Sequence, residues 1–103
     1  MEKKILYVTE DIHNDSYEYY QFLLFNNKKF LYTIRFRNGD SLGFDDDRCI
    51  SIMKEDGTWE NIADRNMVGC KVSLNYYGLP NDKRSRRDEI IDKFDNFLEA
   101  VYG

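Results

Sequence analysis

The chain has 103 residues, of which 42% are hydrophobic and 16% aromatic, so it is long enough to bury one packed core. Charged residues make up 33% and the formal net charge is −4, which disfavours broad binding to polyanions, since nucleic-acid-coating domains are usually basic. No apolar run approaches the ~20 residues of a membrane helix, and the run from Ile5 to Thr9 is too short for a signal peptide. The sequence therefore predicts a single cytoplasmic domain over residues 1–103, with no membrane contact.

Two strands are predicted near the N-terminal end of a β-rich part that covers residues 1–77. Residues 17–25 are apolar or aromatic at nearly every position, as expected of a central strand that is covered on both sides. Residues 29–37 alternate apolar and polar side chains. A three-residue turn at 26–28 would place matching faces opposite each other, with Leu24 beside Phe30 and the pairs Phe22–Tyr32 and Tyr20–Ile34 following.

A second turn is predicted at Arg37-Asn38-Gly39. A three-residue loop with Gly39 in the left-handed conformation pairs Ile34 with Leu42 and Tyr32 with Phe44. This register keeps apolar residues opposite apolar residues, so we prefer it to a two-residue Asn-Gly loop.

Further along the chain, Asp56-Gly57 predicts a hairpin between residues 49–54 and 58–62. Residues 69–77 alternate again and predict a last strand.

An amphipathic helix is predicted over residues 83–102. Its apolar residues recur at steps of three and four, which is the stripe of a helix that packs on a core. They are Ile90, Ile91, Phe94, Phe97, Leu98 and Val101. The predicted fold class is α+β: an antiparallel meander of six or seven short strands, as a curved sheet or partial barrel, packed by this one C-terminal helix.

Groups that could perform catalysis are scarce. The chain has one histidine, His13, and two cysteines, Cys49 and Cys70, which both fall on apolar strand patterns. Carboxylates and His13 between residues 10 and 18 include ligand types that bind divalent cations, but their spacing matches no established metal loop. We therefore expect no enzyme activity, no metal and no cofactor.

Acidic residues carry the leading hypothesis for function. Carboxylates on a surface can take the place of nucleic-acid phosphates against the basic active site of a partner. The sequence thus suggests a small non-catalytic inhibitor of the toxin-immunity or phage anti-defence type, which occludes a basic protein such as a toxin or nuclease. The candidate partner-binding residues are Asp40, Asp45, Asp46, Asp47, Glu10 and Asp11.

Basic residues support an alternative hypothesis, a nucleic-acid-binding accessory domain in which tyrosines stack on bases. Its candidate anion-binding residues are Arg35, Arg37, Lys83, Arg84, Arg86 and Arg87. Cations at the start of a helix oppose the helix dipole, so the 83–87 cluster suggests a role in binding anions. Trp59, beside the Asp56-Gly57 turn, is expected to cap the core rather than to bind a ligand.

Overall fold

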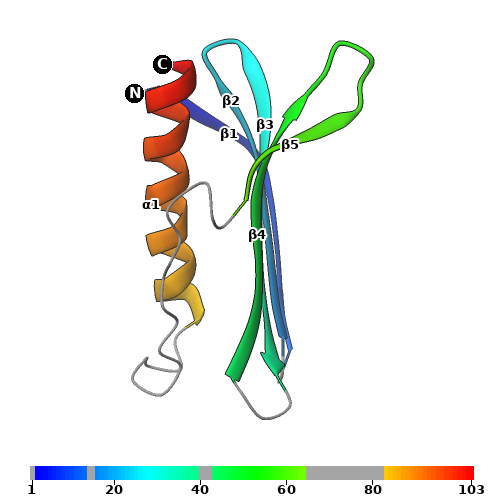
Figure 1. The fold of residues 1–103 in the computed structure, drawn as a ribbon, viewed down its shortest axis with the longest axis vertical. Helices are drawn as coiled ribbons and strands as arrows, with labels where there is room; N and C mark the ends of the chain where they lie inside the picture. The colour runs from blue at the N-terminus through cyan, green and yellow to red at the C-terminus, as the bar shows by residue number, and fades with distance from the viewer. Residues whose placement is uncertain (1, 14–15, 40–42, 65–82) are drawn as a thin grey trace.

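The structure is a computed structural model that describes residues 2–13, 16–39, 43–64 and 83–103 (Figure 1). Within these ranges the chain forms one open antiparallel sheet of five strands, in the order β1-β2-β3-β4-β5, and one helix. The elements are β1 (Lys3–Ile12), β2 (Ser16–Phe25), β3 (Lys28–Gly39), β4 (Gly43–Met53), β5 (Trp59–Asp64) and α1 (Lys83–Tyr102).

The α+β class and the C-terminal helix are confirmed. The number of strands among the described residues is five rather than six or seven, and the sheet is not closed into a barrel. The strand predicted at residues 69–77 lies outside the described residues.

The helix covers one face of the sheet (Figure 1). Buried residues of α1 pack against alternate residues of the strands, which is how a helix and a sheet form a two-layer core. This core contains Tyr17, Tyr19, Leu23, Phe25, Phe30, Tyr32, Ile34, Phe36, Ile50, Ala63, Ile90, Phe94 and Leu98. In β2 the buried residues are the odd-numbered ones, so the even-numbered side chains belong to the other face.

The turn between β2 and β3 differs from the prediction. It contains two residues, Asn26 (φ 52°) and Asn27 (φ 64°), and Phe25 pairs with Lys28. Asparagine tolerates this left-handed conformation, and two such residues form the turn that fits the twist of a hairpin. Because the register slips by one residue, Leu23 rather than Leu24 pairs with Phe30, and the predicted faces of β2 are exchanged.

The turn between β3 and β4 was also predicted in the wrong place. β3 continues to Gly39, which pairs with Gly43, so the connection falls at residues 40–42. Tyr32 pairs with Ile50, and Ile34 pairs with the buried Arg48. This register extends the two strands and preserves an apolar pair on the face next to the helix.

The hairpin predicted at Asp56-Gly57 is confirmed by the β4–β5 connection. Gly57 has φ 84°, and its N–H donates to the carbonyl of Lys54 at 3.0 Å. The Asp56 carboxylate accepts hydrogen bonds from the N–H and hydroxyl of Thr58 at 2.9 and 2.6 Å. The β4–β5 hairpin leans away from α1, whereas the β2–β3 hairpin lies nearer to the helix (Figure 1).

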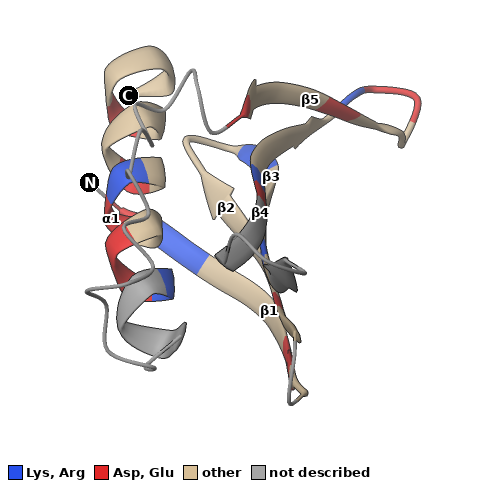
Figure 2. Ribbon diagram, turned by 60° about the horizontal axis from the view of Figure 1, so that its bottom comes forward, with Lys and Arg blue, Asp and Glu red and all other residues tan. Residues whose placement is uncertain are grey.

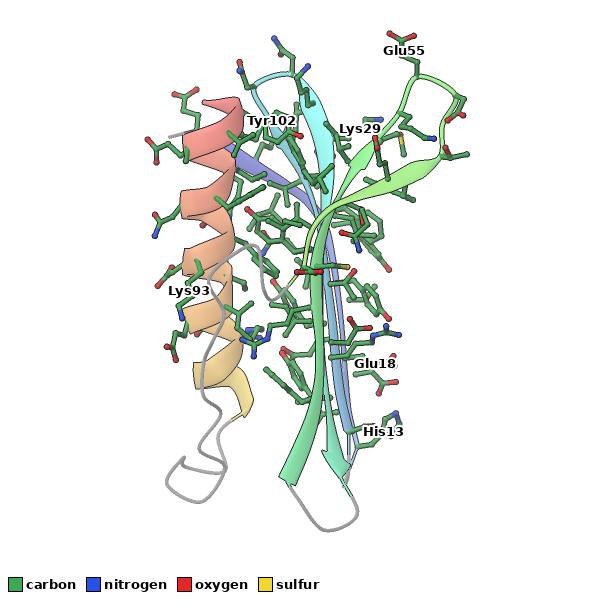
Figure 3. All side chains as sticks on the ribbon, viewed as in Figure 1. His13, Glu18, Lys29, Glu55, Lys93 and Tyr102 are labelled. Carbon is green, nitrogen blue, oxygen red and sulfur yellow. The ribbon has the colours of Figure 1, made fainter. Side chains whose placement is uncertain are left out.

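Aromatic contacts and an ion pair fasten α1 to the sheet. The Phe94 ring lies edge-on to the Tyr32 ring, with ring centroids 5.0 Å apart. Tyr102 points toward the sheet in Figure 3, and the centroid of its ring lies 5.1 Å from that of Phe30. Lys3 at the start of β1 binds Asp95 of the helix at 2.8 Å, where Figure 2 shows the basic start of β1 close to α1. Val101 belongs to the predicted stripe but is 56% exposed, so it contributes little to this packing.

Candidate functional site

An aromatic row crosses the face of the sheet opposite α1. Tyr7 of β1 lies beside Phe22 of β2 with ring centroids 5.9 Å apart, and Phe22 lies 5.9 Å from Trp59 of β5. Tyr7 is 60% exposed and Trp59 is 36% exposed, and no described element packs against this face. We call it the open face.

A groove of about 450 Å³ is associated with this aromatic row. β1 contributes Leu6 and Tyr7 to its lining, and β4 and β5 contribute Met53 and Trp59. Its lining also includes Phe22 and Lys29. Figure 3 shows Lys29 between the β2–β3 and β4–β5 hairpins. A mostly apolar groove with one cation has the composition of a binding site for a partly apolar, anionic group.

A larger hollow of about 600 Å³ lies where the start of β1, the β2–β3 turn and the end of α1 meet. Its lining carries both signs of charge, for example Lys4 and Glu99. The Lys3–Asp95 ion pair and the hydrogen bond from Asn26 to the Tyr102 carbonyl join the same elements. We therefore interpret this hollow as the seam between the helix and the sheet and the groove as the candidate binding site.

The six acidic residues predicted to bind a partner do not form one described surface. The Glu10 carboxylate bonds to Tyr17 and Arg87, that of Asp11 bonds to His13 at 2.9 Å, and that of Asp47 bonds to Arg35. These carboxylates already have partners within the molecule. The side chains of Asp40, Asp45 and Asp46 lie outside the described residues, although the backbone of Asp45 and Asp46 belongs to β4.

The described basic residues are separated as well. Arg35 lies on the open face in register with Asp47, whereas Arg87 contacts Glu10, Tyr17 and Tyr19 on the face next to the helix. The sheet therefore stands between these two arginines. The side chains of the remaining predicted anion-binding residues lie outside the described part: Arg37, Lys83, Arg84 and Arg86.

Arg87 links the first turns of α1 to two strands. Its guanidinium bonds to the Glu10 carboxylate and lies 3.2 Å from the Tyr17 hydroxyl, which itself donates to Glu10 at 2.7 Å. It also lies 5.0 Å from the centre of the Tyr19 ring, within the range of a cation–π contact. The side chains of Arg87 and Glu10 are 19% and 25% exposed. Arg87 thus has a structural role, because it joins the start of α1 to β1 and β2.

The Arg87→Met variant is expected to lose about 1–3 kcal/mol of unfolding free energy, because Glu10 and Tyr17 would keep their positions without their partner. Urea denaturation followed by circular dichroism measures this loss. Lys93→Met, at a position where the side chain points away from the sheet in Figure 3, is the matched control. Equal stability of the two variants would leave Arg87 without a structural role.

Cys49 and His13 do not form a catalytic pair. Cys49 is in β4 and His13 follows β1, so three interstrand steps of ~4.8 Å, about 14 Å in all, separate their strands. A nucleophile and its base must lie within about 3 Å. Across the described ranges, no group of three His, Cys, Asp or Glu side chains is placed to hold a metal ion. Cys70 lies outside them.

The residues that the sequence did not identify are those of the groove. Trp59 was expected to cap the core, but it lies at the open face, where it contacts Phe22. The available signal was the apolar character of both faces of β2, because one helix can cover only one of them.

Comparisons with known proteins give no information about this site. No protein-family model matches the chain, and comparisons with curated proteins and with solved structures gave no significant match. In the part of the chain that the structure describes, no helix is long and apolar enough to cross a membrane.

Proposed function

We propose that the chain is a non-catalytic protein-binding module that holds a partner protein against its open face. The observation that carries this proposal is the row of Tyr7, Phe22 and Trp59, which remains accessible on a face that the helix does not cover. Tyrosine and tryptophan are the residues most often responsible for binding energy at interfaces, since they bring a large rigid area with a polar tip.

An inhibitor that blocks a basic site, of the toxin-immunity or anti-defence type, is one role for such a module. The net charge of −4 supports it. Nucleic-acid binding has less support, since both described arginines of that hypothesis already bond to carboxylates.

The proposal is tested by photo-crosslinking in cells that produce the chain. A photoreactive phenylalanine analogue replaces Trp59 in one variant and the exposed Asn96 of α1 in another. We expect a protein of defined mass to be crosslinked from position 59 and not from position 96. Crosslinking from position 96 alone, or crosslinking of nucleic acid from position 59, would contradict the proposal.

With the partner identified, Trp59→Ala is expected to weaken its binding by about 2 kcal/mol, which is roughly thirtyfold in Kd. Val101→Ala, which truncates an exposed apolar side chain of α1, should leave Kd unchanged. Calorimetric titration measures both constants, and thermal unfolding checks that both variants fold. Equal affinities of the two variants would show that the open face does not supply the binding energy.

A further inference from the structure

The outer edge of β1 is an exposed strand edge with apolar side chains. β1 is a ten-residue strand at the end of the strand order, and among the described residues only β2 pairs with it. Its centre carries Ile5, Leu6, Tyr7 and Val8, which are 50%, 45%, 60% and 41% exposed. Figure 2 shows an uncharged stretch between a basic start and an acidic end of this strand. Proteins usually protect such an edge with charges, so an apolar centre favours pairing with another chain.

An irregularity in β1 links this edge to the groove. The register with β2 shifts between Ile5 and Tyr7, so Leu6 is an extra residue relative to the partner strand. A bulge bends the strand in which it occurs and disturbs its pairing. This bulge lies at Leu6 and Tyr7, the two residues of β1 that line the groove, so the groove extends to this edge strand.

The charge at the groove indicates the chemistry of its occupant. Lys29 is exposed, lines the groove and forms no ion pair with a described residue. Lys4 belongs to the same cross-strand row, because Lys4 and Lys29 both pair with Leu24. A carboxylate near these two ammonium groups would be complementary to them.

From these observations we infer that the groove and the β1 edge together bind an extended acidic segment of a partner protein, an inference that rests on the proposed protein-binding function. The segment adds a strand to β1 through backbone hydrogen bonds. An apolar side chain enters the groove beside Trp59, and an aspartate or glutamate of the segment contacts Lys29. No described strand pairs with the outer edge of β1 beside the groove, which favours a protein segment over a small amphiphile, because only a peptide backbone can satisfy that edge.

The test is a selection of twelve-residue random peptides displayed on phage against the full-length chain. We expect the selected peptides to alternate apolar residues and to contain aspartate or glutamate. Trp59 is the one tryptophan of the chain, so its fluorescence reports occupation of the groove without a label. Peptide binding should shift that fluorescence and slow hydrogen exchange of the β1 amides.

A matched pair of charge reversals tests the role of Lys29. Lys29→Glu is expected to raise the Kd of the selected peptides about tenfold or more, whereas Lys93→Glu, the same change on α1, should not alter it. Equal affinities in the two variants, selected peptides without acidic residues, or the absence of any selected peptide would overturn the inference. So would a dimer of the chain that protects β1 without peptide.

Failure of this inference can be told apart from failure of the proposed function. Peptides that change Trp59 fluorescence without protecting β1 would remove the edge-pairing mode while the open face remained a binding surface. A second result to distinguish is a partner protein that is crosslinked from position 59 and binds Lys29→Glu as tightly as it binds the wild type. That result would contradict only the acidic character of the bound segment, and the proposed protein-binding function would stand.

Discussion

Replacing Phe94 with alanine is expected to cost about 3–5 kcal/mol of unfolding free energy, because it removes a fully buried aromatic side chain from the centre of the core. Phe94 contacts the Tyr32 ring at 5.0 Å and lies one helical turn from the buried Ile90 and Leu98. The total unfolding free energy of a small domain is about 5–15 kcal/mol, so this change takes the chain close to unfolding. Urea denaturation monitored by circular dichroism measures the loss.

Two further variants keep this prediction testable when Phe94→Ala does not fold. Phe94→Leu keeps most of the apolar volume and is expected to lose less stability than the alanine variant. Val101→Ala, at a position that is 56% exposed on the same helix, should change stability by less than about 0.5 kcal/mol. A Phe94→Ala variant as stable as Val101→Ala would mean that α1 does not pack through Phe94.

The helix could be predicted because its sequence signal has a single interpretation. A stripe at steps of three and four fits only a helix, and Ile90, Phe94 and Leu98 are indeed its buried residues. The strand register carried no such signal. β2 is apolar on both faces, so a slip of one residue between Leu23 and Leu24 leaves an equally apolar pattern opposite Phe30.

Arginines of β3 and aspartates of β4, which the sequence analysis assigned to two alternative binding sites, lie on neighbouring strands. In the observed register Arg35 pairs with Asp47 and Arg37 with Asp45, which places opposite charges on adjacent strands. Cross-strand pairs of this kind stabilise a register. Matching of apolar residues alone favoured the earlier turn, so including the charged pairs could have identified the longer hairpin.

The position of the candidate site follows from which face of the sheet the helix covers, and the sequence does not indicate that face. The helix could have packed on either face of the sheet, and the face that it leaves uncovered becomes the surface that contains Phe22 and Trp59. The bulge at Leu6 has no sequence signature such as glycine, so the path of the groove to the β1 edge could not be predicted either.

The buried tyrosines predict that stability falls steeply in alkali. Burial and a hydrogen bond to Asp95 raise the pKa of Tyr32 above its ordinary value of 10.0. Burial and a hydrogen bond to Glu10 likewise raise the pKa of Tyr17. Above pH 10 the unfolded chain releases these two protons while the folded chain retains them, so rising pH favours unfolding. Their contribution to stability is complete below pH 10 and declines as the pH rises toward the folded-state values.

For each of these tyrosines, the unfolding free energy is expected to fall by about 1.4 kcal/mol for every pH unit above 10. Urea denaturation between pH 8 and 11.5 measures the slope. Tyr32→Phe should be less stable at neutral pH by about 1 kcal/mol, because the hydrogen bond to Asp95 is lost, but its stability should fall less steeply in alkali. Tyr7→Phe removes a tyrosine that is 60% exposed and should keep the wild-type slope. Parallel curves for Tyr32→Phe and the wild type would mean that the Tyr32 hydroxyl ionises within the folded protein, and the contact between β3 and Asp95 of α1 would then not protect it from solvent.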